Sequence, residues 1–125
     1  RLEWKFQMKL FGILDDAEAN DRSDVVSWVN DGTAIQIHNP EQLQEIYLPQ
    51  YFEEEGYSYS KFRYAFNNYG FRSFSGVMHH PLFDKNDRAK SHEISTNTEK
   101  VSRWVQTPYV YKGQVVDSYR KTKRR

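Results

Sequence analysis

The N-terminal stretch combines two hydrophobic patterns. Apolar residues alternate from Leu2 to Leu10, which would suit a half-buried strand. Spacings of three and four residues also place several apolar side chains on one face of a helix. We favour a helix over about residues 4–14, followed by a polar loop over residues 15–24. The expected inward side chains are Phe6, Leu10, Ile13 and Leu14.

Two pairs of short runs rich in strand-forming residues predict hairpins. In the first, Asp31-Gly32 separates the runs, and these residue types readily adopt the positive φ that tight turns need. In the second, Ser75-Gly76 takes that place. We expect Trp28 to bury its indole in the first hairpin. The paired runs are residues 25–29 with 33–38 and residues 71–74 with 77–79.

Two further helices are predicted between these hairpins. In the first of them, Asn39 can cap and Pro40 suits the first helical position. Pro49 lacks an amide hydrogen and is expected to kink or end this helix. The acidic run 53–55 then leads to a stop at Gly56. The inward side chains would be Leu43, Ile46 and Tyr47.

The next helix is the clearest element of the sequence. Ser58 or Ser60 can cap its start, and Gly70 closes it. Four aromatic residues form a stripe that we expect in the core: Tyr59, Phe62, Phe66 and Tyr69. At about 100° per residue, the opposite face is polar, basic and free of carboxylates. It is centred on Ser60, Tyr64 and Asn67, with Arg63 on one flank and Lys61 and Asn68 on the other.

The order of these elements predicts an α+β fold of the winged helix-turn-helix type. Three helices would pack on a small four-stranded antiparallel sheet with a short wing. The segment 84–100 is polar and loop-like, so we expect the compact unit to end near Phe83. We divide the chain into a winged-helix domain, residues 1–90, and a C-terminal extension, residues 91–125.

The extension has an apolar part and a basic part. Residues 101–119 are too apolar for a plain linker and could dock on the domain, bind a protein partner or self-associate. Within them, Lys112-Gly113 could turn a small hairpin. Residues 120–125 carry five positive charges, a composition typical of nuclear-import or phosphate-contacting tails.

The net charge of +1 conceals a strong asymmetry along the 125 residues. Residues 1–57 hold 4 Lys and Arg against 12 Asp and Glu, whereas residues 58–125 hold 14 against 5. Such a balance favours a polyanionic partner for the second half of the chain. The alternative is that an acidic face and a basic face only keep the domain soluble.

Other classes of function find little support. The chain has no cysteine, no apolar run near the roughly 20 residues of a membrane span and no signal-peptide pattern. It begins with Arg1, and we expect it to be a piece of a longer protein. His79 and His80 are adjacent, so in a strand they point to opposite faces and cannot readily share a metal. No nucleophile and base can be placed together, so we expect neither an enzyme nor a metal or cofactor site.

Five short motifs then indicate a family. They are Phe6-x-x-Lys9-Leu10, Trp28 with Asp31-Gly32, Leu48-Pro49-x-Tyr51-Phe52, Phe62-x-x-x-Phe66-Asn67-x-Tyr69-Gly70-Phe71-Arg72, and His80-Pro81-x-Phe83. In their order and approximate spacing, over about residues 4–83, the chain resembles the DNA-binding domain of the heat-shock transcription factors. The resemblance implies a winged helix-turn-helix whose third helix lies in the major groove of duplex DNA.

The chain departs from this family in three respects. The family's base-reading arginine falls at Tyr64, and Arg63 lies about 100° round the helix from it. The wing, about residues 73–77, is shorter than is usual for the family. The family's coiled-coil trimerisation region has no counterpart here. The target sequence and the oligomeric state therefore do not carry over.

We expect a sequence-specific duplex-DNA-binding domain of a nuclear transcription regulator, with residues 58–69 as recognition helix. Its amides and Arg63 suit base edges, Tyr64 suits a thymine methyl or a sugar, and cations at the helix ends suit phosphates. Asn67 could instead make a structural hydrogen bond. The alternatives are a winged-helix module for protein contact and an architectural protein that binds DNA without preference. The candidate DNA-binding residues are Ser60, Lys61, Arg63, Tyr64, Asn67, Asn68 and Arg72.

Overall fold

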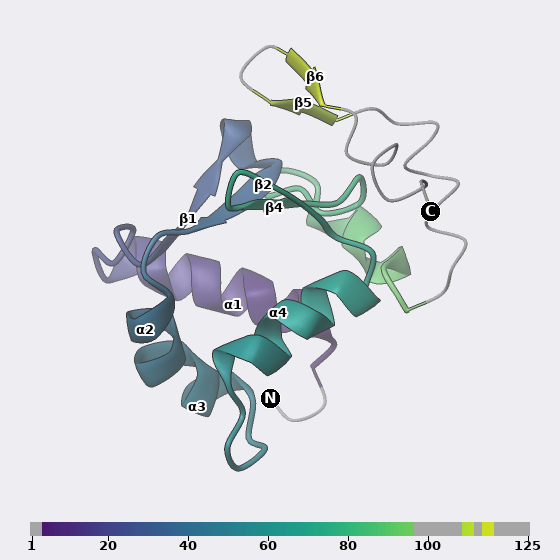
Figure 1. Cartoon of the computed structure of the whole chain (residues 1–125). Coiled ribbons are helices and arrows are strands. Elements are labelled where there is room, and N and C mark those ends of the chain that lie inside the picture. Colours follow the sequence, from purple (N-terminus) through teal and green to yellow (C-terminus); the bar gives the residue numbers. More distant parts are fainter. Residues whose placement is uncertain (1–3, 97–108, 112–113, 117–125) are drawn as a thin grey trace.

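The computed structural model describes residues 4–96, 109–111 and 114–116 (Figure 1). Its helices gather on one side of a four-stranded antiparallel sheet, whose strand order is β1-β2-β4-β3. This confirms the predicted α+β winged helix-turn-helix. The strands are β1 (Val26–Val29), β2 (Ala34–Ile37), β3 (Arg72–Phe74) and β4 (Val77–His79).

Both predicted hairpins are present in the sheet. Between β1 and β2, a 3₁₀ turn, η1 (Asn30–Gly32), takes Asp31 and Gly32 into the left-handed region with φ of 57° and 89°. Between β3 and β4, Ser75 and Gly76 do the same with φ of 52° and 78°. The second turn is only these two residues long, so the wing is as short as the sequence predicts.

The second helix runs through three different geometries. It passes from α2 (Pro40–Gln42) through a π-type turn, η2 (Leu43–Tyr47), into α3 (Leu48–Tyr51). Asn39 caps it as predicted, because its side-chain oxygen accepts a hydrogen bond from the Gln42 amide at 3.1 Å. Pro49 does not end the helix. The wider turn before it takes up the loss of a helical donor, so the chain stays helical to Tyr51.

The first helix is longer than the sequence pattern predicts. Helix α1 (Phe6–Ala19) extends five residues beyond the expected end at Leu14, so the prediction of a loop from residue 15 was wrong over 15–19. Ala17 is fully buried and continues the apolar face by one turn. Asp16 accepts a hydrogen bond from the Tyr47 hydroxyl at 2.6 Å. Contacts with the second helix therefore hold this polar turn helical.

The segment after the sheet is also more ordered than predicted. A 3₁₀ helix, η3 (Arg88–Glu93), lies where we expected a loop. The buried Gln7 side chain donates to the Ser91 carbonyl at 2.8 Å and to the Ile94 carbonyl at 3.2 Å. Because Ile94 belongs to the core cluster, the packed unit does not end at Phe83. The division at residue 90 stays a prediction.

The extension contains the hairpin suggested by its sequence. Strand β5 (Tyr109–Tyr111) pairs antiparallel with β6 (Gln114–Val116), with Tyr109 opposite Val116. The turn Lys112-Gly113, the segment 97–108 and the basic tail lie outside the described residues. The proposed docking or self-association of residues 101–119 therefore stays a prediction.

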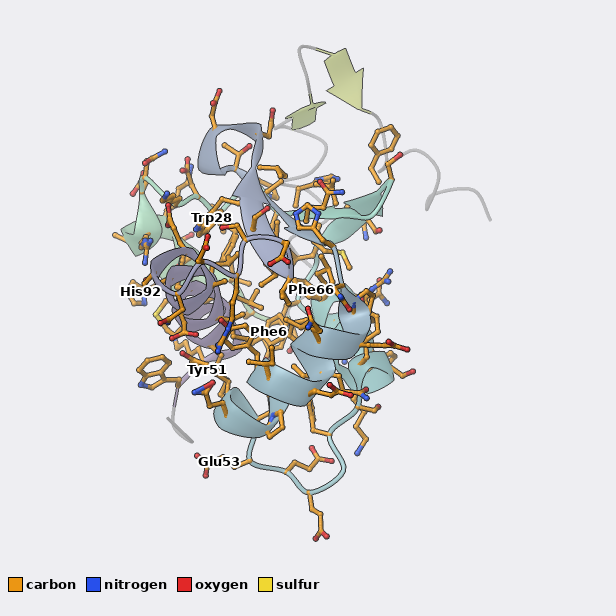
Figure 2. The ribbon with its side chains drawn as sticks, turned by 90° about the vertical axis from the view of Figure 1, so that its left-hand side faces the viewer. Phe6, Trp28, Tyr51, Glu53, Phe66 and His92 are labelled. Atoms are coloured by element: carbon orange, nitrogen blue, oxygen red, sulfur yellow. The ribbon has the colours of Figure 1, made fainter. Side chains whose placement is uncertain are left out.

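Two aromatic clusters join the layers of the fold. Phe6 of α1 stacks on Tyr69 with 4.9 Å between ring centroids and meets Phe66 edge-on at 5.3 Å. Figure 2 shows Phe6 between α1 and helix α4 (Tyr59–Asn68). On the sheet side, Trp28 stacks on Phe83 at 5.2 Å. Its indole packs against the core as predicted, although the residue is only half-buried.

We predict that Phe6→Ala strongly destabilises the domain, by about 3–5 kcal/mol, because it removes a buried ring of α1 that packs against α4. The midpoint of urea unfolding measures the loss. Gln50→Ala, at an exposed position of α3, serves as control and should stay within about 0.5 kcal/mol of the parent protein. Equal midpoints for the two variants would contradict the central role of Phe6.

Candidate nucleic-acid interface

Helix α4 is fixed at both ends by hydrogen bonds. Ser58, rather than Ser60, is the cap: its hydroxyl oxygen accepts from the Lys61 amide at 3.2 Å. The side chain of Gln44 accepts from the Tyr59 amide at 2.6 Å, which ties α4 to the preceding helix. At the other end, Gly70 turns the chain away with a φ of 86°. The helix therefore has a defined position relative to the second helix.

The inward face of α4 is the predicted aromatic stripe. Phe62 and Phe66 are each only 2% exposed, and Tyr59 and Tyr69 pack half-buried against the same core. This confirms that the stripe is core rather than a stacking platform. The opposite face is consequently turned outward.

The predicted DNA-contacting residues of the helix lie together on that outward face. Tyr64, at its centre, is 65% exposed. The other side chains predicted from the helix are exposed as well, so the helix presents hydroxyl, amide and cationic groups on one surface. The residues of this outward surface are Ser60, Lys61, Arg63, Tyr64, Asn67 and Asn68. Their contacts with DNA stay a prediction.

The two cations of the helix lie on its flanks. The Arg63 guanidinium stands over the ring of Tyr59, one turn earlier, at 6.0 Å from its centroid. The Lys61 ammonium forms an ion pair with the Glu54 carboxylate. Neither cation is at the centre of the outward face, which is left to Tyr64.

Glu54 is a feature of the site that the helical pattern does not reveal. The helix itself carries no carboxylate, but the loop before it places one against Lys61. That loop is anchored by Tyr57, whose ring stacks on Phe52 at 4.4 Å with an interplanar angle of 3°. Burial, with a further effect from Glu54, raises the pKa of Tyr57 to about 12. Figure 2 shows the neighbouring Glu53 on the same loop.

Arg72 occupies a different element from the other candidates. It lies half-buried on β3, directly opposite His79 of β4, rather than on the helix surface. His79 is fully buried, and burial together with the Arg72 charge lowers its pKa to about 3. His80 is buried as well, and its Nδ1 accepts from the Leu82 amide at 3.0 Å. These histidines thus pack within the fold.

A cavity of about 350 Å³ lies on the side of α1 that faces away from α4. Its lining is mostly apolar, and a bidentate ion pair between Arg88 and Asp15, at 2.8 and 2.9 Å, stands at its edge. Figure 2 places His92, one of its lining residues, across the molecule from Phe66. The cavity is separate from the outward face of α4.

Residues 4–96, 109–111 and 114–116 contain no group of three or more histidine, cysteine, aspartate or glutamate side chains that could hold a metal ion. In the same part of the chain, no helix has the length and apolar character that a membrane crossing requires.

The fold and this surface define a winged helix-turn-helix module with an outward-facing third helix. Comparison with known proteins gives the family: the family model described as HSF-type DNA-binding matches residues 6–125. The chain therefore belongs to the HSF-type DNA-binding family. This family and fold are those of a DNA-binding transcription factor, which is not an enzyme class.

Individual relatives agree with this assignment. Heat stress transcription factor B-1 of Arabidopsis thaliana is 36% identical over 67 residues, which make up 54% of this chain but only 22% of that protein. Skn7 of Chaetomium thermophilum, solved with SSRE DNA, has a TM-score of 0.61 at 22% identity and covers 75% of this chain and 100% of that one. The same protein with HSE DNA gives 0.60 at 23% identity, covering 71% and 96%.

Because the pKa of His79 is about 3 in the folded protein and about 6.5 in an unfolded chain, the unfolded state takes up its proton first as the pH falls. The contribution of His79 is fully present above pH ~6.5 and is lost below it, by up to about 1.4 kcal/mol per pH unit. We predict a falling melting temperature between pH 7 and 5, and a weaker fall in His79→Gln. Gln50→Ala, at an exposed position and without a titratable group, is the control and should keep the parental slope. An unchanged slope in His79→Gln would contradict the assignment.

Proposed function

We propose that this chain binds duplex DNA sequence-specifically, with α4 in the major groove, as part of a nuclear transcription regulator. The observation that carries the proposal is the two-sided helix: buried rings fix one face, and the other presents exposed polar groups. The major groove admits a helix and displays a distinct pattern of donors and acceptors for each base pair. The matching family model, described as HSF-type DNA-binding, supports the same function, and so does the similarity to Skn7 structures solved with DNA.

The residues of the interface have different proposed roles. Arg63 and Asn67 reach base edges, where arginine pairs well with guanine and asparagine with adenine. Ser60 and Asn68 contribute further polar contacts at the ends of the face. Lys61 meets phosphates, and so does Arg72 from β3. The basic residues 120–125 are proposed to add sequence-independent affinity and to serve nuclear import.

Fluorescence anisotropy on a random duplex pool, followed by selection of bound sequences with and without the basic tail, tests the proposal. We expect micromolar or tighter binding that weakens steeply as salt rises, since bound phosphates release counterions. A selected consensus would distinguish specific binding from the architectural alternative. Absence of duplex binding at all salt concentrations would contradict the proposal and favour a role in protein contact.

Substitutions should separate base reading from phosphate binding. We predict that Arg63→Ala relaxes the preference at one base pair and weakens the selected site by about 1–3 kcal/mol. Lys61→Ala should weaken all sequences alike and reduce the salt slope by about 1. Binding curves on the selected duplex and on a scrambled duplex give both quantities. If Arg63→Ala changes neither affinity nor preference, α4 is not the reading helix.

The Glu54–Lys61 ion pair makes a further prediction. Glu54→Gln should tighten DNA binding, because it releases the Lys61 ammonium for a phosphate and removes a repelling charge. Exposed ion pairs contribute about 0–1 kcal/mol, so we expect a gain of up to about fivefold and a slightly steeper salt dependence.

The matched control is Glu55→Gln, which removes a charge from the same exposed loop. The gain in DNA affinity in Glu55→Gln measures the general reduction in repulsion. The additional gain in affinity in Glu54→Gln, which is the excess over this control, measures the release of Lys61. In a Lys61→Ala background this excess should vanish, as a double-mutant cycle would report. An excess that persists without Lys61 would contradict the role of the ion pair.

A further inference from the structure

Tyr64 is an unusual residue for an exposed helical surface. Among the described residues, it and Trp4 are the large hydrophobic side chains that remain exposed, at 65% and 45%. Tyr64 lies at the middle of the outward face of α4, one turn after Ser60 and one turn before Asn67 and Asn68. A large ring at this place adds nothing to the packing of the core, since the inward face of the helix is already formed by Phe62 and Phe66.

The position of Tyr64 is well defined before any partner binds. The helix that carries it is capped by Ser58 and held on the core by its buried rings. A tyrosine has only two side-chain torsions, so little conformational freedom is lost when its ring makes a contact. An aromatic side chain that a fixed helix presents at the centre of a binding surface is typical of a residue that contributes to affinity.

The flanking groups leave the centre of the face to an uncharged contact. Arg63 is drawn back over the ring of Tyr59, and Lys61 is paired with Glu54. With both cations at the sides, what meets the base at the centre is the face or edge of a phenol ring. In the major groove, the apolar feature on the base edges is the thymine 5-methyl group, whereas the other bases present polar atoms to a side chain.

We propose that Tyr64 recognises the 5-methyl group of a thymine at the centre of the target site. This inference rests on the proposed function, because it assumes that α4 lies in the major groove. Burial of the methyl group against the ring contributes binding free energy, and a pyrimidine without this methyl group at the same position lacks that contribution. The 5-methyl group of 5-methylcytosine occupies the same position in the groove, so that base should substitute for thymine better than cytosine does.

The experiment uses the full chain and the duplex obtained by selection, in which each thymine in turn is replaced by deoxyuridine. This change removes one methyl group and leaves the hydrogen-bonding edge unaltered. We expect one central position at which the replacement weakens binding about fourfold, the equivalent of one buried methyl group. At that position, a pair with 5-methylcytosine should bind more tightly than a pair with cytosine.

Two variants assign the effect to Tyr64. In Tyr64→Ala the sensitivity to deoxyuridine at that position should disappear, whereas Tyr64→Phe should retain it, because the ring rather than the hydroxyl makes the contact. Both changes are at an exposed site, and circular dichroism verifies that the variants fold. An unchanged sensitivity in Tyr64→Ala, or no sensitive position in the parent protein, would overturn the inference.

The outcomes also separate this inference from the proposed function. Salt-dependent binding and a selected consensus, without a methyl-sensitive position, would leave the proposed function standing and refute the role of Tyr64. Absence of duplex binding would refute both. Sensitivity that disappears in Tyr64→Phe as well as in Tyr64→Ala would show that the contact with the methyl group depends on the hydroxyl, which contradicts recognition by the ring.

Discussion

The packing of Phe6 against the third helix is the interaction on which the interface depends. Phe6 stacks on Tyr69 and meets Phe66 edge-on. Helix α4 has 10 residues, a length at which an isolated helix is marginal in water. Its stability and orientation therefore come from this aromatic contact and from its caps. Because Phe62 and Phe66 are committed to the core, the polar face can only point outward.

The charge asymmetry of the sequence is partly cancelled in the folded chain. Acidic residues of the first half pair with cations of the second, as Glu54 does with Lys61 and Glu18 with Lys85. Asp15 likewise holds Arg88 in a bidentate pair. On α4, Arg63 stands against an aromatic ring instead of a carboxylate. Counting charges along the sequence therefore overstates the positive potential available at the surface of the helix.

The sequence predicted those features that depend on local chemistry, and it failed where distant contacts decide. Turn residues such as Gly76 and the cap Asn39 have short-range signatures, and both hairpins and the second helix start as predicted. The last turn of α1 and the helix η3 form because of partners far along the chain, including the hydrogen bond from Gln7 to the Ser91 carbonyl. The pattern of α4 predicted its outward face but not the carboxylate of Glu54, because that residue is close in sequence but lies in the loop before the helix.

An uncharged centre changes how such a surface would discriminate between sequences. Phosphate contacts act on every duplex alike, so cations raise specific and non-specific affinity together. Here Lys61 is paired with Glu54, and the wing is a turn of two residues that adds little surface. A larger share of the binding energy must then come from short-range contacts between the helix and base edges. Those contacts depend on the base present, and Tyr64 is an exposed large hydrophobic side chain of α4 placed to make one.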